Sequence, residues 1–248
     1  MSWPAGWRVT AVDETGSTNA DLLAAAAVGA PDRTVLAAAH QTAGRGRLDR
    51  TWTAPPGANL LVSLLFRDVP PAVHELTQRV ALAAARAATA LTGADVRLKC
   101  PNDLLVGDAK LAGVLAQAGM RTDAGGRGAI DHVVVGIGLN VGWAPPDAAR
   151  LADATDAGAA GAPHPLDLLA RLLAEYDRLP PMVHGAYRAA LATIGRRVRV
   201  ELPGGTSVDG LAVDVEPDGR LVVDVDGPSG GEVHRYDVGD VVHLRAAR

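Results

Sequence analysis

Apolar and polar positions follow two different periods in the first 195 residues, and this pattern predicts a sheet covered by helices. Apolar runs of strand length stand at 7–12, 34–39, 59–66, 96–99, 104–106, 110–117 and 132–140. The run at 59–66, NLLVSLLF, is apolar over its whole length, which favours a strand covered on both faces. Tight turns between the short runs predict a mixed or largely antiparallel sheet.

Helical spacing of apolar residues predicts the helices. The segment 73–91 has the longest such pattern, so we expect the longest helix there, laid across the sheet. A helix is expected to begin at Ser17, Thr18 and Asn19, whose short polar side chains can cap free N–H groups, and to run to about Val28. Two further helices are predicted at 166–176 and 182–194, a hairpin loop at 122–128 and a surface loop at 147–164.

The pattern changes to short strand-like segments after Gly195. They stand at 197–202, 207–215, 220–225, 232–236 and 241–244, with Gly-rich or Pro-containing turns between them. Five strands in about fifty residues suit a small barrel, so we place a domain boundary near Arg196. The predicted fold class is α+β, with a helix-flanked sheet over residues 1–195 and a small β-barrel over 196–248.

Composition narrows the class of protein. The chain has 248 residues, 48% of them hydrophobic, which is enough for a large core, and its formal net charge of −4 argues against general nucleic-acid binding. A single cysteine, Cys100, excludes an internal disulfide. The sequence has neither a leader-like start nor an apolar run of membrane-spanning length, so we expect a cytoplasmic protein without membrane contact.

The segment 40–52, HQTAGRGRLDRTW, carries the strongest chemical signal. Arg45, Arg47 and Arg50 share a short loop with Gly44 and Gly46. Glycines let a backbone approach a ligand closely, and guanidinium groups bind phosphate or carboxylate through two contacts. Taken alone, the loop favours a solvated segment or a nonspecific nucleic-acid contact, but it adds local positive charge to an acidic chain.

Two other polar clusters lie at predicted strand ends or helix starts. One is Ser17 to Asn19, and the other contains Lys99, Asn102, Asp103 and Lys110. Together with the arginine loop, the lysines suit a ligand with several negative charges, such as a nucleoside triphosphate. The GxxxxGK[ST] signature is missing, and the GIGLN segment at 136–140 is followed by Pro145 and Pro146, so a dinucleotide fold is excluded.

In the order of its motifs the chain resembles the biotin protein ligases, which attach biotin to a lysine of carboxylase carrier domains. The resemblance rests on ETGSTNADLL, QTAGRGRLDRTW, APPGANLLVSLLF, RLKCPNDLL, KLAGVL, VVVGIGLNV and GDVVHLR, and it covers essentially the whole chain. It implies a class II synthetase-like catalytic domain, an SH3-like C-terminal barrel, ATP and biotin as substrates with Mg²⁺, and a biotin carboxyl carrier protein domain as partner. The expected assembly is a monomer or weak homodimer.

The resemblance also implies roles for single residues. Biotin would be bound by Ser17, Thr18, Asn19, Gln41, Gly44, Arg45, Lys110 and Gly113. ATP and the adenylate would be bound by Arg47, Arg50, Trp52, Lys99, Asn102, Lys110 and Asn140, with Trp52 stacking on adenine and Asn140 reading its edge. Catalysis would depend on Arg45, Arg47, Lys110, Asn102 and Asp103, and the metal ligands stay unknown.

Two positions depart from the family pattern. Cys100 stands where the family usually has tryptophan, and Asp49 replaces the last glycine of the arginine loop, where it adds a negative charge. Only about sixteen residues precede Ser17, too few for a DNA-binding domain, so we expect no repressor activity. The alternatives are a lipoate ligase, a thioester-forming acyltransferase that uses Cys100, and a nucleic-acid-binding module.

Overall fold

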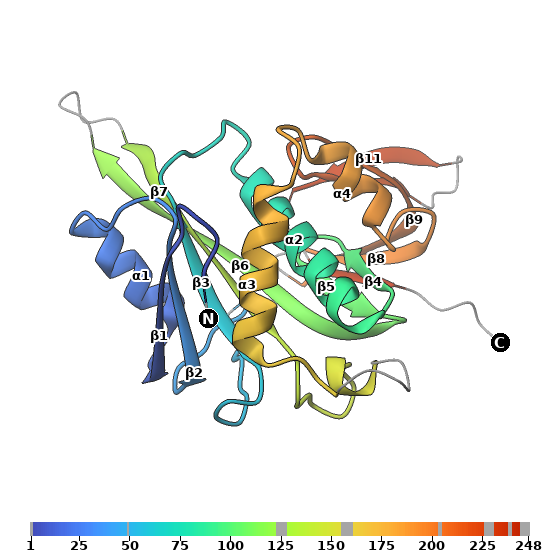
Figure 1. Cartoon of the computed structure of the whole chain (residues 1–248). Coiled ribbons are helices and arrows are strands. Elements are labelled where there is room, and N and C mark those ends of the chain that lie inside the picture. Colours follow the sequence, from blue (N-terminus) through green and yellow to red (C-terminus); the bar gives the residue numbers. More distant parts are fainter. Residues whose placement is uncertain are drawn as a thin grey trace.

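A seven-stranded mixed sheet forms the centre of the computed structural model (Figure 1). The structure describes residues 2–48, 50–122, 128–154, 161–202, 205–225, 231–237 and 240–243. The strands are β1 (Arg8–Thr15), β2 (Thr34–Gln41), β3 (Leu60–Phe66), β4 (Val96–Lys99), β5 (Asp103–Val106), β6 (Ala109–Thr122) and β7 (Gly128–Leu139). Their order is β1-β2-β3-β7-β6-β5-β4, and β1 and β2 run parallel while the other neighbours are antiparallel.

Helices cover both faces of this sheet. They are α1 (Thr18–Ala27), α2 (His74–Thr92), α3 (Pro165–Asp177) and α4 (His184–Ala190), with a short 3-10 helix at Leu151–Asp153. The long helices α2 and α3 lie side by side across one face, and α1 lies on the other (Figure 1). This is why β3 is buried along its whole length, as the NLLVSLLF pattern predicted.

The side chains of β3 alternate between two cores, as the strand period requires. Leu60, Val62 and Leu64 belong to the large core that includes α2 and α3. Leu65 belongs to a smaller core under α1, together with Val134 of β7. The face of β3 that carries Leu65 therefore looks toward α1.

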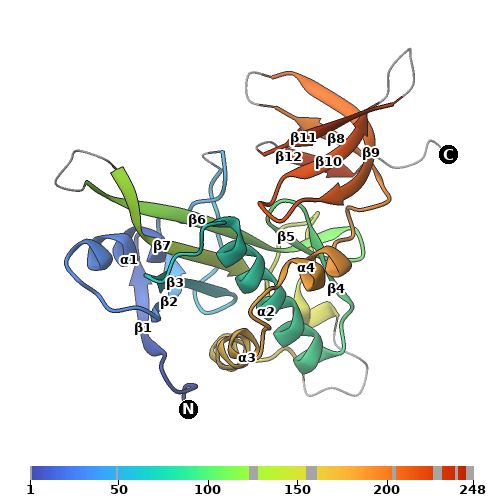
Figure 2. The same cartoon turned by 90° about the horizontal axis from the view of Figure 1, so that it is seen from above.

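A second, five-stranded antiparallel sheet follows from Arg197. Its strands are β8 (Arg197–Glu201), β9 (Ser207–Val215), β10 (Leu221–Val225), β11 (Glu232–Tyr236) and β12 (Asp240–His243), in the order β11-β10-β9-β8-β12. It lies beside β4, β5 and α4, at the opposite end of the molecule from α1 (Figure 2). The predicted α+β class with an SH3-like C-terminal unit is confirmed, although in the described residues β11 and β12 do not pair to close a barrel. The domain boundary at residue 196 stays a prediction.

Three predicted segments have different limits in the structure. The helix expected at 182–194 spans only His184–Ala190, because Leu191 is extended and pairs with Leu98 of β4. Strands β6 and β7 continue beyond the predicted 110–117 and 132–140, since their ladder runs on to the pair of Thr122 and Gly128. Most of the loop predicted at 122–128 and residues 155–160 of the loop predicted at 147–164 lie outside the described residues. Among the described residues, none of the helices has the length and apolar character needed to cross a membrane.

Candidate active site

A cavity of about 280 Å³ opens on the sheet at the N-terminal end of α1. Its wall combines residues from α1, β2, the arginine loop, β5, β6 and β7. Thirteen of the fifteen predicted site residues line it: Ser17, Thr18, Asn19, Gln41, Arg45, Arg47, Arg50, Trp52, Asn102, Asp103, Lys110, Gly113 and Asn140. Gly44 and Lys99 are not part of the wall.

Glycines create the space for this cavity. Gly113 of β6 lies opposite Gly138 of β7, and Gly136 lies opposite Ser63 of β3, so one sheet face carries hardly any side-chain bulk here. The side chains of Trp52 and Asn19 occupy that space. A Cβ at Gly138 would stand 2.5 Å from the indole of Trp52, and a Cβ at Gly136 would stand 2.1 Å from Oδ1 of Asn19.

The arginine loop folds back on itself as a small hairpin. Arg45 pairs with Thr51, and the Gly46 N–H donates to the Arg50 carbonyl at 2.7 Å. At Gly44 a Cβ would stand 2.4 Å from the Trp52 carbonyl oxygen, so this position accepts only glycine. Gly44 therefore shapes the loop. Asp49, the departure noted in the sequence, lies outside the described residues.

Cationic groups from separate segments converge on the cavity. Arg45, Arg47 and Arg50 come from the loop, and Lys110 comes from β6. The Lys110 ammonium lies 2.6 Å from a carboxylate oxygen of Asp103 and 5.8 Å from the centroid of the Trp52 ring. Four cations near one carboxylate make this a positive chamber in a chain of net charge −4.

Two asparagines in the wall are held by the protein itself. The Asn102 side chain donates to the Val114 carbonyl at 2.8 Å and accepts a hydrogen bond from Arg47 at 3.2 Å. Asn102 thereby ties the arginine loop to β6. The Asn140 side chain donates to the Ala149 carbonyl at 3.0 Å and accepts from Asn59, so its amide is engaged with the protein and the adenine contact stays a prediction.

The start of α1 is built differently from the capping arrangement that the sequence predicted. Ser17 occupies the N-cap position, but its side chain makes no capping hydrogen bond. The next two side chains turn away from the helix end: Thr18 bonds Gln41 and Ser63, and Asn19 bonds Ser63 and β6. The capping prediction was wrong because the tertiary partners compete successfully for these polar groups.

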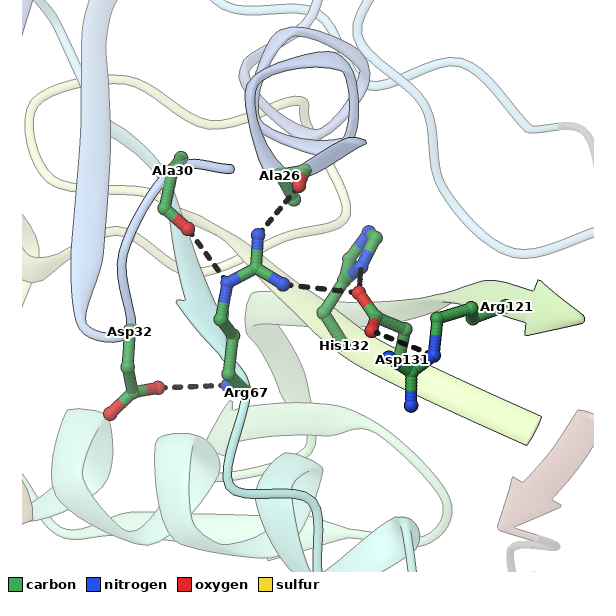
Figure 3. A network of polar contacts seen from close by, with 7 residues as sticks. All are labelled: Ala26, Ala30, Asp32, Arg67, Arg121, Asp131 and His132. Atoms are coloured by element: carbon green, nitrogen blue, oxygen red, sulfur yellow. Dashed lines mark hydrogen bonds and ion pairs between the residues drawn. The ribbon is translucent and has the colours of Figure 1, made fainter. Parts of the chain in front are cut away.

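The far end of α1 is fixed by Arg67, which follows β3 (Figure 3). Its guanidinium donates to the carbonyl of Ala26, in the last turn of the helix, at 2.6 Å and to that of Ala30, just beyond the helix, at 2.7 Å. The same group donates to Asp131 at 3.0 Å, and Asp131 also bonds His132. Helix α1 is therefore tied to the sheet at both ends.

Comparison with known proteins decides the family. The model of the biotin/lipoate A/B protein ligase family matches residues 15–140, and that of the biotin protein ligase C-terminal domain matches residues 193–244. The chain is 44% identical to a biotin–[acetyl-CoA-carboxylase] ligase of Mycobacterium tuberculosis, over 97% of this chain and 91% of that protein. The chain belongs to the biotin/lipoate protein ligase family.

A second sequence relative and a solved structure agree with this family assignment and with the fold. A biotin–[acetyl-CoA-carboxylase] ligase of Paracoccus denitrificans is 31% identical over 88% of this chain and 94% of its own length. The structure of the biotin protein ligase of Aquifex aeolicus in complex with biotin and ATP superposes with a TM-score of 0.76, covering 96% of this chain and 99% of that one, at 23% identity. The structural similarity extends over both sheets of this protein.

Cys100 does not take part in the reaction. It is 3% exposed, belongs to the large core and is not part of the cavity wall. Burial raises the pKa of its thiol to about 12, although Arg47 and Lys99 act in the opposite direction. A thiol that is protonated and buried is not a nucleophile, so the thioester-forming alternative is rejected.

Sequence reasoning missed several residues of the ligase site. Gly136 and Gly138 are in the cavity wall, and Ser63 and Gln117 bond the start of α1 behind it. The signal was present, because glycines two positions apart on a buried strand leave one sheet face bare. A serine in the middle of NLLVSLLF also breaks an otherwise apolar strand.

Proposed function

We propose that this protein is an ATP-dependent ligase that converts biotin to biotinyl-5′-AMP and transfers the biotinyl group to a lysine of a biotin carboxyl carrier protein domain. The observation that carries the proposal is the convergence of Arg45, Arg47, Arg50 and Lys110 on one cavity. A lipoate ligase is the weaker candidate, since the curated relatives that match most of the chain are named as biotin ligases.

The first half-reaction joins two anions. A carboxylate oxygen of biotin attacks the α-phosphorus of ATP, the bond to the β-phosphate oxygen breaks, and pyrophosphate leaves. The cationic groups lower the barrier because they offset the repulsion between carboxylate and phosphate and stabilise the charge that develops on the leaving group. Lys110 and Arg47 would serve this role from the cavity wall, where Lys110 contacts Asp103 and Arg47 contacts Asn102.

Mg²⁺ enters this reaction as part of the substrate MgATP. Magnesium keeps several of its waters and binds mainly to phosphate oxygens, so it needs few protein ligands. The described residues contain no cluster of three or more groups suited to hold a metal, and Asp103 is the carboxylate of the cavity wall. Such a wall suits a metal that is carried in by its nucleotide.

In the second half-reaction the amine of the carrier lysine attacks the acyl carbon and AMP leaves. A free lysine has a pKa of about 10.4 and is mostly protonated at neutral pH. Asp103, whose side chain is partly exposed in the cavity, can orient the ammonium and accept its proton.

The remaining assignments belong to the same proposal. Ser17, Thr18, Asn19, Gln41 and Gly113 would contact biotin, and Trp52, Arg50 and Asn140 would contact the nucleotide; all eight residues line the cavity. The partner is the carrier domain of an acyl-CoA carboxylase, and the protein works in the cytoplasm as a monomer or weak homodimer.

Incubation with MgATP, biotin and a purified carrier domain, followed by mass measurement of the carrier, tests this function. The expected result is a mass increase of one biotinyl group that requires ATP and disappears when the target lysine of the carrier is changed to arginine. Lipoate in place of biotin is the matched control. An increase with lipoate but not with biotin would transfer the assignment to the lipoate ligases, and no increase with either acid would refute it.

A further inference from the structure

A chain of close polar contacts runs along the wall of the cavity from β6 to β2. The Asn19 side-chain N–H groups donate to the Leu115 carbonyl at 3.3 Å and to Gln117 Oε1 at 2.8 Å. Asn19 Oδ1 accepts from Ser63 Oγ at 2.5 Å, and Ser63 Oγ lies 2.7 Å from Thr18 Oγ1. Thr18 Oγ1 lies 3.0 Å from Gln41 Oε1.

The first link fixes the direction of the protons along this chain. A backbone carbonyl only accepts hydrogen bonds, so the Asn19 group that faces Leu115 is the NH₂ group and the opposite atom is Oδ1. Oδ1 also only accepts, and the Ser63 proton must therefore point to Asn19. Ser63 Oγ then has no proton left for Thr18 and acts as its acceptor.

Thr18 has a single hydroxyl proton and two acceptors within reach. Ser63 Oγ is the nearer one at 2.7 Å, and Gln41 Oε1 at 3.0 Å already accepts the Thr18 backbone N–H at 2.7 Å. The proton therefore goes to Ser63. With the hydroxyl proton on the Ser63 side, Thr18 Oγ1 and Gln41 Oε1 present two acceptor oxygens, 3.0 Å apart, at the cavity wall.

Such a pair is suited to receive an N–H group from a ligand. The ring of biotin is a cyclic urea with two N–H groups, and the dithiolane ring of lipoate has none. We propose that Ser63 is a positioning residue that sets the polarity of the biotin site: by accepting the Thr18 proton, it makes Thr18 Oγ1 and Gln41 Oε1 a joint acceptor for a ureido N–H. This inference rests on the proposed function.

Ser63 acts on the ligand only through Thr18. It is fully buried, at 0% exposure, and is not part of the cavity wall. Gly136, directly opposite Ser63 in the neighbouring strand, allows the arrangement because its missing side chain leaves room for the Asn19 amide. The polarity of the site is thus determined by groups that the ligand never touches.

Neutron diffraction of the deuterium-exchanged wild-type protein tests the proton directions without any substitution. The deuterium of Ser63 is expected on the line to Asn19 Oδ1, and that of Thr18 on the line to Ser63 Oγ. A Thr18 deuterium that points to Gln41 in the ligand-free protein would overturn the proposal.

Binding measurements with Ser63→Ala test the consequence. Without the Ser63 oxygen, the Thr18 proton turns to Gln41 and occupies the joint acceptor, so we expect the Kd for biotin to rise about tenfold, the value of one hydrogen bond. The probe for comparison is the cyclic carbonate analogue of biotin, in which oxygen replaces both ring N–H groups. Its Kd should not rise, so the preference for biotin over the carbonate should fall by at least the same factor. Ser63→Thr keeps the hydroxyl and should restore that preference.

Thr92→Ala is the matched control, because it removes another buried hydroxyl, which donates to the Ala88 carbonyl in α2. We expect it to lower the thermal stability without changing the Kd for biotin. Equal weakening of biotin and carbonate in Ser63→Ala would show that Ser63 only supports the fold, and this would overturn the inference. Wild-type protein that binds neither biotin nor its adenylate would instead refute the proposed function.

Discussion

Gly138→Ala should displace the Trp52 indole from its packing position on Gly138 of β7. The added methyl carbon would stand 2.5 Å from Cε2, 2.6 Å from Nε1 and 2.9 Å from Cζ2 of the indole. Carbon atoms in contact prefer about 3.5–4.0 Å, so the ring has to retreat by about 1 Å. The added methyl group is attached to β7, which is paired with β3 on one side and β6 on the other. The backbone at Gly138 therefore cannot move to relieve the clash.

The magnitude follows from the role proposed for Trp52. Stacking of a nucleobase on an aromatic ring is worth about 1–3 kcal/mol, which corresponds to roughly 5- to 150-fold in affinity. A displaced Trp52 ring would lose a large part of this stacking free energy. We expect the KM for ATP in biotin-dependent pyrophosphate exchange to rise at least about tenfold, while the protein stays folded, since overpacking costs about 1–3 kcal/mol.

Two other glycines provide graded controls. At Gly113 a methyl group would stand 3.3 Å from the flexible Lys110 ammonium and 3.4 Å from the Trp52 ring, so Gly113→Ala should raise the KM for ATP less than Gly138→Ala. Gly185→Ala meets nothing within 4 Å and should leave the kinetics unchanged. If Gly113→Ala impaired ATP use as much as Gly138→Ala, the packing of Trp52 on Gly138 would not be the cause and the reasoning would fail.

Three further substitutions address the charged groups. Lys110→Ala should lower pyrophosphate exchange at least about a hundredfold, because it removes a cation of the cavity wall that we propose to stabilise the reacting anions, with little change in the melting temperature; near-normal exchange would move the phosphate site elsewhere. Arg47→Gly removes the contact that ties the loop to Asn102, so activated biotin should escape and label added free amines faster, and an unchanged rate of adenylate release would contradict this role of the loop. The hydrogen bond from His132, with help from Arg67, lowers the pKa of Asp131 in spite of partial desolvation. A lowered carboxylate pKa stabilises the folded state above the unfolded pKa and loses that effect as the pH falls through the folded value, so the melting-temperature gap between wild type and Asp131→Asn should be full at pH 7 and narrow below about pH 4. A gap independent of pH would count against this ion pair as its source.

Local patterns predicted most of the fold because burial leaves a direct trace in sequence. The apolar run of β3, the helical period of α2 and the short strands after Gly195 all correspond to elements of the structure. Errors occurred where a distant partner decided the outcome. Helix α4 ends early because Leu191 pairs with β4, and the side chains at the start of α1 leave the helix end for partners on β2, β3 and β6.

The motifs supplied the chemical groups of the candidate site but not their arrangement. Thirteen of fifteen predicted residues line one cavity, but Lys99 is not part of its wall, and Gly44 shapes the turn of the loop. Ser63 escaped notice because a lone serine in an apolar strand has no local signature of function. Its meaning depends on Asn19 and Thr18, which lie more than forty positions away in the chain.

The sequence by itself determined the kinds of groups available, the periods of the elements and, through motifs in a fixed order, the resemblance to a family, since each of these depends on neighbouring residues. Only the tertiary structure decided which oxygens lie within hydrogen-bond distance of Thr18 and Ser63 and how close Trp52 lies to Gly138. Hydrogen-bond polarity and steric clearance are properties of atoms a few ångströms apart, and folding brings those atoms together from segments that the sequence keeps separate.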